Sequence, residues 1–473
     1  MKASHRWLAE LSGVDASAQE VADALTRLGL EVEDMEAHGF GLDHVVVAEV
    51  RAKEPVPKKD KLTLVTVFDG EGERKVICGA PNVPEPGGRI VLAKPGAVLP
   101  GGFAIADREV GGVLSSGMLC SETELGIGEG TAGILVLQAG DPGRPGQLVA
   151  DALGLEDHVF DISLTPNRPD CLGHLGLARE LALAFEKAYR RPSPGAPPRL
   201  ISGVERADAP DELPMIEDQS QPVDTLTLVE ARPDVPALVP IEIEDSERCP
   251  RYAGGVVQGV TVAPSPFWLR YRLFCLGVRP IDNVVDVTNL VLLELGHPIH
   301  AFDLAKLRGS KIVVRRAAEG EVMPTLDGQA RTFTADDLLI CDGEGPVAVA
   351  GVMGGLNSEI DASTKDVLIE VAYFDARSIR RTSRRLGLHT ESSHRFERGI
   401  DPNGVPWAMR RAATLICALA NAAAAPIARD VCPKPIAEKA IDFEPSHVAR
   451  LTGAAIDEAQ TRTALEAIGC SIS

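Results

Sequence analysis

Aromatic side chains make up only 4% of the 473 residues, so the hydrophobic cores must be built mainly from Ala, Val, Leu and Ile. No run of about 18 apolar residues occurs, and the first segment lacks the apolar stretch of a signal peptide. Basic residues are in deficit, with 48 Lys and Arg against 68 Asp and Glu, a net charge of −20. This argues against a surface coated in positive charge for DNA or a membrane. We therefore expect a cytoplasmic protein that contacts neither, and any contact with RNA should be local.

Cysteine is present, but its pattern argues against two kinds of site. The nine cysteines are an odd number, are scattered along the chain and form no CxxC pair, so neither a disulfide framework nor a cysteine zinc site is indicated. The 45 Gly and 34 Pro predict many turns, which argues against a helical bundle. At about 150 residues per domain, the length predicts about three domains.

A capping box opens the first predicted helix. Ser17 and Glu20 have the required spacing, and Gly29 is a natural helix stop before a predicted strand at 30–32. A similar unit lies near the end of the sequence, with Asp457 and Gln460 as the cap pair, Leu465 and Ile468 as the apolar face, Gly469 as the stop and Ile472 in the strand. The similarity is compatible with an internal duplication or with a generic helix–turn–strand unit.

The sequence pattern of residues 40–151 predicts a small β-barrel. Short β-rich runs such as 45–50 and 62–67 alternate with turns that contain Gly and Pro, and the pair Asp69-Gly70 predicts a hairpin turn. Lysines in the loop before the second run are candidates for contacts with RNA phosphates, and a solvated surface loop is the alternative. They are Lys58, Lys59 and Lys61.

An α+β region follows the barrel. A helix-like stretch at 176–185 comes first, and the Pro- and acid-rich segment 191–238 is predicted to be a linker or surface insertion. The region from 239 to about 400 carries strand signals and apolar runs, and a helical run is predicted at 407–424. The strand signals and apolar runs lie at 241–243, 284–293, 312–314, 338–340, 347–352 and 367–371.

Four of the ten histidines fall in this region, which suggests a test for a metal site. His297 and His300 flank Pro298, which disfavours the helical face that an HxxH pair needs, and no HExxH pattern occurs, so we predict no metal ligand. Acid–base or recognition chemistry needs only one histidine and one carboxylate, and Glu370 at the end of an apolar strand is a candidate. Gly354, in a glycine pair, can let a ligand approach the backbone or form an ordinary turn. The remaining histidines are His389 and His394.

Five arginines form a stripe in an otherwise acidic chain. Their steps of i, i+3, i+4, i+7 and i+8 place all of them on one face of a helix. Such a face can bind RNA phosphates or an acidic partner, or it can be a solvated surface paired with nearby carboxylates. The five are Arg377, Arg380, Arg381, Arg384 and Arg385.

Seven short strings together exceed what turn chemistry explains. They are ICGAPN (77–82), PGAVLPGG (95–102), GMLCSE (117–122), LTPNRPD (164–170), VDVTN (285–289), HAFD (300–303) and TESSHRFER (390–398). In this order and at these separations, they resemble the β subunit of bacterial phenylalanine–tRNA ligase. The resemblance covers the chain apart from the segment near 191–238.

The resemblance implies an α+β multidomain fold. Residues 1–39 and 152–190 would form a split N-terminal domain around an inserted OB-fold tRNA-binding domain at 40–151. An editing domain at 239–400 would follow the linker, and 401–473 would hold a helix and an incomplete domain of helix–turn–strand type. The family's catalytic-like and anticodon-binding domains, with the acidic magnesium residues, would lie beyond this segment.

The resemblance also implies a function. In this family an α subunit carries out aminoacylation with ATP and Mg²⁺ in an α2β2 heterotetramer, while the β subunit hydrolyses tyrosine wrongly attached to phenylalanine tRNA. This segment itself is expected to bind no cofactor. By their positions in the matching strings, Glu370 would accept the tyrosine hydroxyl and His300 would lie beside the ester and its water. The substrate pocket would be lined by Thr288, Asn289, Gly354, Thr390 and Ser392.

Ser392 is a departure, because the family often has alanine there. Its hydroxyl would narrow the pocket or add a hydrogen bond. Two other classes of function stay open: a non-catalytic RNA-binding protein that uses the barrel and the arginine stripe, and a metallohydrolase that needs bound metal. The presence of both His300 and Glu370 favours the editing subunit.

Overall fold

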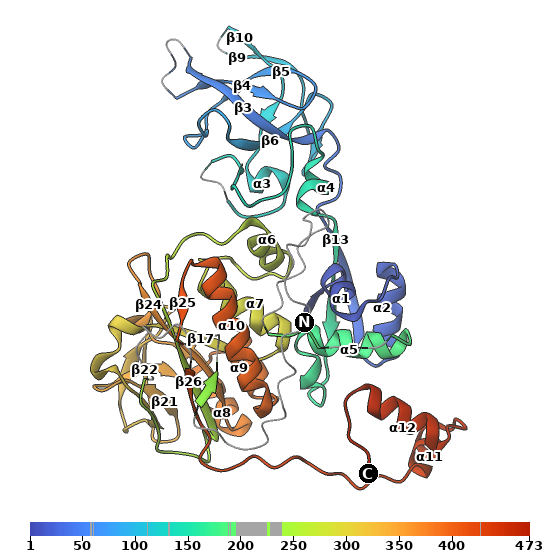
Figure 1. The fold of residues 1–473 in the computed structure, drawn as a ribbon, viewed down its shortest axis with the longest axis vertical. Coiled ribbons are helices and arrows are strands. Elements are labelled where there is room, and N and C mark those ends of the chain that lie inside the picture. Colours follow the sequence, from blue (N-terminus) through green and yellow to red (C-terminus); the bar gives the residue numbers. More distant parts are fainter. Residues whose placement is uncertain are drawn as a thin grey trace.

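The computed structural model describes residues 1–56, 59, 61–110, 112–130, 133–187, 189, 191–194, 225–227, 239–425 and 427–473. They form a barrel, a small sheet with helices, a larger region with two sheets and a pair of C-terminal helices (Figure 1). Within these ranges, none of the helices combines the length and the apolar character that crossing a bilayer requires. Most of the expected linker 191–238 lies outside the described residues.

A small antiparallel sheet joins chain segments from both sides of the barrel. Its strands run in the order β1 (Lys2–Ser4), β13 (Asp157–Ser163) and β2 (Glu31–His38). Its neighbouring helices are α1 (His5–Ser12), α2 (Ala18–Arg27) and α5 (His174–Ala184). The predicted capping box is confirmed, because the Ser17 hydroxyl accepts from the Glu20 N–H and the Glu20 carboxylate accepts from the Ser17 N–H at 2.8 Å.

The barrel is a nearly closed sheet whose end strands, β11 (Met118–Leu119) and β5 (Glu73–Cys78), approach each other. The Asp69-Gly70 turn joins β4 (Thr63–Phe68) to β5 as predicted, and Gly70 has the positive φ of 92° that such a turn favours. The strand order is β11 (Met118–Leu119), β6 (Arg89–Ala93), β3 (Val45–Pro55), β4 (Thr63–Phe68) and β5 (Glu73–Cys78), with β12 (Val136–Leu137) on β6. Shorter elements are β7 (Val98–Leu99), β8 (Phe103–Ala104), β9 (Arg108–Val110), β10 (Val113–Ser115), α3 (Glu122–Leu125) and α4 (Val149–Leu153).

Two sheets pack together in the larger region. The first has the order β14 (Thr225–Thr227), β26 (Ile427–Val431), β16 (Arg251–Gln258), β24 (Asp366–Tyr373) and β17 (Ile299–Asp303), with β25 (Ala423–Ala424) on β16. The second has the order β15 (Ile241–Ile243), β18 (Ile312–Arg316), β21 (Leu338–Cys341), β22 (Pro346–Val349) and β23 (Met353–Gly354). A separate hairpin pairs β19 (Val322–Pro324) with β20 (Ala330–Thr332).

The first sheet is covered on both faces. Val367 and Ile369 of β24 share a hydrophobic core with the helices on one face, whereas Leu368 and Ala372 share a core with the second sheet. Since side chains alternate along a strand, Glu370 faces the second sheet. The helices on the first face are α6 (Phe267–Cys275), α7 (Val285–Leu295) and α10 (Val405–Leu419), and the further helices of this region are α8 (Ala376–Leu386) and α9 (Glu391–Phe396).

Three details of the sequence prediction are wrong. The apolar run 284–293, grouped with the strand signals, lies largely in α7, because an apolar segment that reaches 11 residues is longer than a typical strand and suits a buried helix, even with polar residues such as Asp286 and Thr288 in it. The helical run 407–424 ends at Leu419, and its last two residues form β25. The strand expected at Ile472 does not form, because 471–473 have no partner strand in the described chain, whereas β2 pairs with β13.

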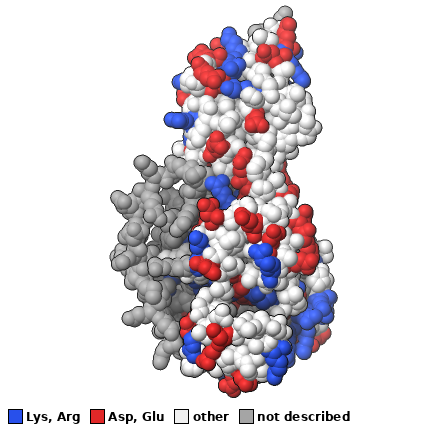
Figure 2. Space-filling view, turned by 90° about the vertical axis from the view of Figure 1, so that its right-hand side faces the viewer, with Lys and Arg blue, Asp and Glu red and all other residues white. Residues whose placement is uncertain are grey.

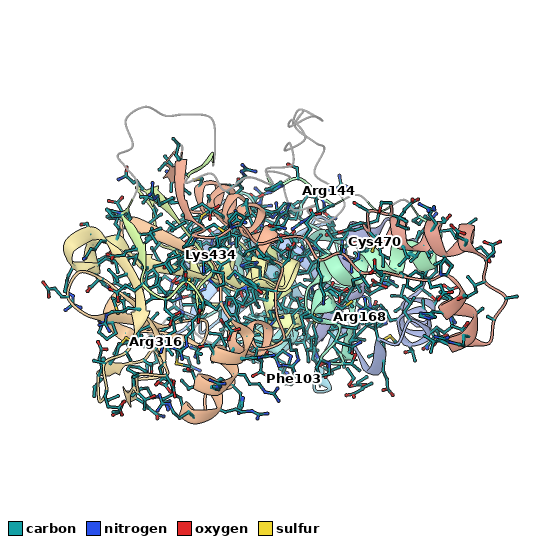
Figure 3. The ribbon with its side chains drawn as sticks, turned by 90° about the horizontal axis from the view of Figure 1, so that it is seen from below. Phe103, Arg144, Arg168, Arg316, Lys434 and Cys470 are labelled. Carbon is teal, nitrogen blue, oxygen red and sulfur yellow. The ribbon has the colours of Figure 1, made fainter. Side chains whose placement is uncertain are left out.

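The C-terminal helices are α11 (Ser446–Thr452) and α12 (Glu458–Ala467). The predicted cap pair Asp457 and Gln460 forms a capping box at the start of α12. Seen from below, Cys470 lies with these helices in the half of the molecule away from Arg316 (Figure 3). In α12 only Thr461 is buried, so this pair contributes little to the cores described above.

Candidate active site

Glu370 and His300 occupy paired positions on neighbouring strands. β24 and β17 are antiparallel, and their register places the Cα of His300 opposite that of Glu370. Side chains directly opposite each other in such a pair share a face, with Cβ atoms about 4.5–5.5 Å apart. The structure therefore brings these two residues together, in the layer between the two sheets.

Burial keeps both groups neutral near pH 7. Glu370 is 6% exposed, and burial raises the pKa of its carboxyl to about 8. The His300 residue is partly exposed, but its ring atom Nε2 is buried, and desolvation lowers the pKa of the imidazole to about 4. Neither Glu370 Oε2 nor His300 Nε2 has a hydrogen-bond partner within the described chain. Buried polar atoms without partners are rare in folded proteins, so these are the atoms that a ligand would satisfy.

Tyr252 on β16 is a third member of the site, and the sequence analysis missed it. The side chain is fully buried, and its hydroxyl has no hydrogen bond of ordinary geometry in the described part of the chain. The hydroxyl lies near the Glu370 carboxyl and lowers its pKa, although burial has the larger and opposite effect. Tyr252 precedes the pair Gly254-Gly255 in an apolar strand, and that polar tip among small residues is the signal that could have found it.

Gly354 lies directly against His300. A Cβ atom at Gly354 would be 2.6 Å from Cε1 and 2.8 Å from Nε2 of the imidazole, closer than real Cβ contacts. The ring also meets Phe302 edge-on, with centroids 4.5 Å apart. Glycine at 354 therefore leaves free the space that the imidazole occupies, and this predicted pocket residue lies against the candidate pair.

Thr390 and Ser392 hold the loop before Gly354 and donate their hydroxyls to it. Thr390 caps α9, and its hydroxyl donates to the carbonyl of Val352 at 2.8 Å. The Ser392 hydroxyl donates to the carbonyl of Gly351 at 3.0 Å. The hydroxyl of Ser392 thus adds a hydrogen bond, one of the two outcomes expected from the sequence.

Thr288 and Asn289 lie on α7 and are not joined to the pair. The Thr288 hydroxyl donates to the carbonyl of Val285 at 2.7 Å within the helix. α7 packs on the face of the first sheet opposite to that of Glu370, and no hydrogen bond between described residues links Thr288 or Asn289 to it. Their place in the substrate pocket stays a prediction.

The histidines considered for a metal site are dispersed. His297 is bonded through Nε2 to the carbonyl of Ala372 at 3.0 Å, His389 is exposed, and His394 lies 3.0 Å from Arg398. Within the described chain, the group whose ligand atoms have metal-like spacing is Asp170, Cys171 and Glu180. Two arginines already compensate it: Arg168 bonds to all three residues, and Arg179 to both carboxylates.

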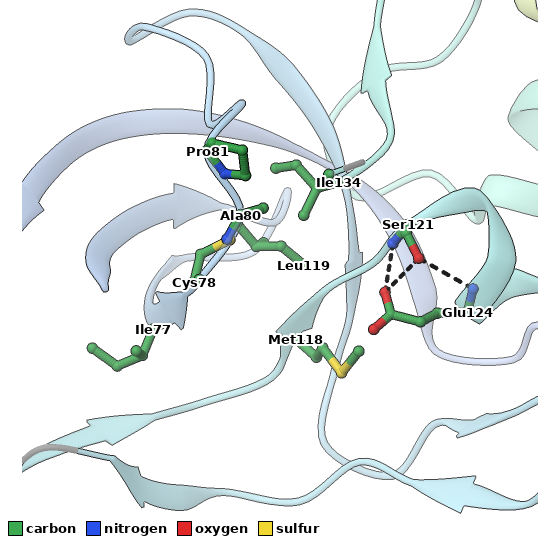
Figure 4. Close-up of a pocket in the computed structure, with 11 residues that line it drawn as sticks. Ile77, Cys78, Ala80, Pro81, Met118, Leu119, Ser121, Glu124 and Ile134 are labelled. Atoms are coloured by element: carbon green, nitrogen blue, oxygen red, sulfur yellow. Dashed lines mark hydrogen bonds between the residues drawn. The ribbon is translucent and has the colours of Figure 1, made fainter. Parts of the chain in front are cut away.

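The barrel carries two hollows that share residues 79–81. One, of about 370 Å³, is lined by apolar side chains and by the capping box of Ser121 and Glu124 (Figure 4). The other, of about 510 Å³, is bordered by Lys53 and Lys61. Lys59 and Lys61 are exposed, and Lys58 lies outside the described residues. On the face that Figure 2 shows, acidic and basic side chains are interspersed over the described residues.

Comparisons with known proteins place two families on this chain. The B3/4 domain matches residues 248–421, which contain Glu370, His300 and Tyr252. The tRNA binding domain family matches 45–144, which contain most of the barrel. The region that contains Glu370, His300 and Tyr252 therefore matches one domain family, and the barrel matches another.

Curated relatives extend the similarity over nearly the whole chain. The phenylalanine–tRNA ligase beta subunit of Geobacter metallireducens is 46% identical over 454 residues, 96% of this chain and 52% of its own length. That of Oleidesulfovibrio alaskensis is 42% identical over 473 residues, 100% of this chain and 55% of its own. The chain thus spans about half the length of these relatives. An N-terminal fragment of the phenylalanyl-tRNA synthetase beta-subunit from Pyrococcus horikoshii, a solved structure, aligns over 99% of this chain and 88% of its own with 12% identity and a TM-score of 0.34, too low to argue a shared fold.

Proposed function

The chain belongs to the phenylalanine–tRNA ligase β-subunit family, and on that basis we propose that it binds phenylalanine tRNA and hydrolyses tyrosine wrongly attached to it. The observation that carries the proposal is the set of unpartnered polar atoms, Glu370 Oε2, His300 Nε2 and Tyr252 Oη, within the B3/4 match. The atoms come from neighbouring strands and lie on one face.

A second site is needed because a hydrophobic pocket discriminates only weakly between phenylalanine and tyrosine. A hydrophobic pocket for phenylalanine rejects an added hydroxyl by only about 10²-fold, whereas a site that hydrogen-bonds the hydroxyl rejects the analogue that lacks it by about 10⁴–10⁵-fold. Tyrosine that escapes the first pocket is thereby selected by the second. Glu370, with Tyr252 beside it, supplies the polar end that such a second site requires.

His300 is proposed to manage the proton of the attacking water. The water oxygen bonds to the ester carbonyl carbon while a proton passes from the water to Nε2, and the bond from that carbon to the ribose oxygen breaks as the ribose oxygen takes the proton back. The pKa of His300, lowered to about 4, keeps the imidazole neutral at pH 7 and able to accept a proton.

The domain layout and partners are part of the proposal. We assign 1–39 and 152–190 to a split N-terminal domain, 40–151 to an OB fold, 239–400 to the editing domain and 401–473 to a helix with an incomplete domain. The pairing of β13 between β1 and β2 supports the split. The complete enzyme would be an α2β2 assembly in the cytoplasm, with ATP and Mg²⁺ at the α subunit.

Among the described residues, arginines compensate the acidic group that has metal-like spacing, so we propose no Mg²⁺ site at that group.

The decisive experiment is a deacylation assay of this chain with tyrosyl-tRNA and phenylalanyl-tRNA, both on phenylalanine tRNA. Tyrosine release should exceed spontaneous hydrolysis by several orders of magnitude, and phenylalanine release should stay near the spontaneous rate. If tyrosine is released no faster than without protein while the tRNA still binds, the chain is a non-catalytic RNA-binding protein.

Gly354→Ala should lower kcat/KM for tyrosine release by about 10²-fold, the cost of a displacement of about 1 Å in a reacting group. The added methyl would overlap the His300 ring, whereas the backbone of Gly354 lacks the positive φ that would itself oppose alanine. Gly140→Ala is the matched control, because a Cβ there meets open space. Equal rates for both variants would show that the position of the imidazole is unimportant.

Tyr252→Phe should reduce kcat/KM for tyrosine release by about 2–12-fold, the value of one neutral hydrogen bond. It should also move the pH–rate profile of tyrosine release to higher pH. The shift is expected because the hydroxyl lowers the pKa of Glu370, so its removal raises that pKa further. Tyr373→Phe, on the same strand as Glu370, serves as the control. An unchanged pH profile in Tyr252→Phe would assign Tyr252 a packing role only.

A further inference from the structure

The arginine stripe forms an exposed row on α8. The helix buries Ser378, Ile379, Thr382 and Ser383, and the arginines point away from this face. Arg385 is bound to Asp337, so the solvated-and-paired alternative holds for that residue. The other four are exposed, and their side chains make no ion pair or hydrogen bond to any described residue. These four, the arginine row, are Arg377, Arg380, Arg381 and Arg384.

α8 lies in the chain between the two segments that build the candidate site. It begins shortly after β24, which carries Glu370, with Asp375 as its N-cap. After α8 the chain passes through Gly387, which has a positive φ of 66°, to Thr390 and α9. The arginine row is therefore covalently close to the site at both ends of the helix.

The packing also fixes α8 to the pocket. A Cβ at Gly351 would be 2.9 Å from Ile379 Cδ1, so α8 rests directly on the loop that leads to Gly354. Ser383 and Ser393 join α8 to α9 through hydroxyls 3.5 Å apart. Because Gly354 contacts His300, a ligand on the exposed face of α8 is held at a defined position relative to the imidazole.

We propose that the arginine row docks the backbone phosphates of the tRNA acceptor end whose ester enters the pocket. This inference rests on the proposed function. The row spans about 10 Å along the helix, at 1.5 Å per residue, and guanidinium groups bind phosphate in bidentate geometry. In a chain of net charge −20, four uncompensated arginines on a helix that packs against the loop leading to Gly354 match a polyanion in charge, and the helix links them to the pocket. An acidic protein surface could also bind the arginine row by its negative charge, but it carries no ester that enters the pocket.

The test compares two triple variants with the same loss of charge. Arg380→Gln, Arg381→Gln and Arg384→Gln remove most of the row. Arg27→Gln, Arg279→Gln and Arg450→Gln remove three exposed arginines elsewhere on the described surface. Two quantities are measured at several salt concentrations. They are the affinity for phenylalanine tRNA that carries no amino acid and kcat/KM for tyrosine release. Each lost phosphate contact on a single strand changes the slope of log affinity against log salt by about 0.7.

The row variant should bind tRNA more weakly and show a slope shallower by about 2, while the control variant keeps the wild-type slope. Hydrolysis of tyrosyl-adenosine, which has the ester and no phosphate, should be equal in all three proteins. If the row variant has the same tRNA affinity and the same salt slope as the control variant, the proposal is overturned. An acidic protein surface would then be the ligand of the arginine row. If wild type hydrolyses neither ester, the proposed function fails, and the binding measurement still decides the role of the row.

Discussion

Glu370→Ala is expected to lower kcat/KM for tyrosine release by about 5–150-fold, because the buried phenol hydroxyl would be left without a partner at a cost of about 1–3 kcal/mol. The carboxyl is buried, lacks a partner at Oε2 and lies opposite His300, so its removal takes away the group that would bind the phenol hydroxyl. Rates are measured on tyrosyl-tRNA, with tRNA affinity as a check that the protein is folded. Unaltered release by a folded variant would remove Glu370 from the site.

The same carboxyl should lower the stability of the protein, and Glu370→Gln isolates this effect because it keeps the shape. The folded-state pKa of about 8 exceeds the ordinary value of 4.5, so the unfolded chain releases its proton first as the pH rises. The carboxyl therefore has no effect below pH 4.5 and destabilises the fold progressively, by about 1.4 kcal/mol per pH unit, up to about pH 8.

Urea unfolding of wild type and Glu370→Gln between pH 5 and 8.5 measures this difference. Glutamine should be the more stable form, and its advantage should grow with pH and level off above about pH 8. A constant difference across this range would mean that the carboxyl titrates normally in the folded protein. We expect Glu370→Gln to raise the free energy of unfolding and to slow tyrosine release. Such a trade-off between stability and activity is typical of residues in functional sites.

The sequence could predict local features because they depend on neighbouring residues. The capping box at Ser17, the turn at Asp69-Gly70 and the helical arginine stripe each follow from spacing over a few residues, and all three form. The pairing of His300 with Glu370 depends on a register between strands 70 residues apart, which the resemblance implied and periodicity alone did not. Tyr252 was missed because an aromatic residue in an apolar strand normally belongs to the core.

Contacts between distant segments were beyond the reach of local patterns. His174 is buried between the Ser4 N–H, 3.1 Å from Nε2, and the Leu293 carbonyl, 2.7 Å from Nδ1. Arg395 is 1% exposed and donates from Nε to the carbonyl of Leu172 at 3.0 Å. These bonds fasten the small sheet and its helices to α7 and α9, and their partners are separated by more than a hundred residues. Only the assembled fold reveals them.

His300→Ala should slow tyrosine release, by less than the 10²–10⁴-fold that a full general base contributes. The ester is already activated, and the neighbouring ribose hydroxyl of the tRNA end can share the handling of the proton. His300 Nε2 is a buried atom without a partner among the described residues, so it is free to accept a proton from a bound water. Desolvation lowers the pKa of the imidazole to about 4, which keeps it unprotonated at pH 7 and also makes it a weaker base, a second reason to expect less than the full effect. Protonation of His300 should therefore not limit the rate until the pH falls toward 4.

The competing view makes His300 a structural residue that packs on Gly354 and Phe302 and contributes only stability. Wild type and His300→Ala are compared on normal tyrosyl-tRNA and on tyrosyl-tRNA whose terminal ribose lacks the neighbouring hydroxyl. If imidazole and hydroxyl share the proton, the variant retains part of its activity on the normal substrate and loses it on the deoxy substrate. Equal rates for both proteins on each substrate would reject the catalytic role and leave Glu370 and Tyr252 as a binding site whose water is activated by the tRNA itself.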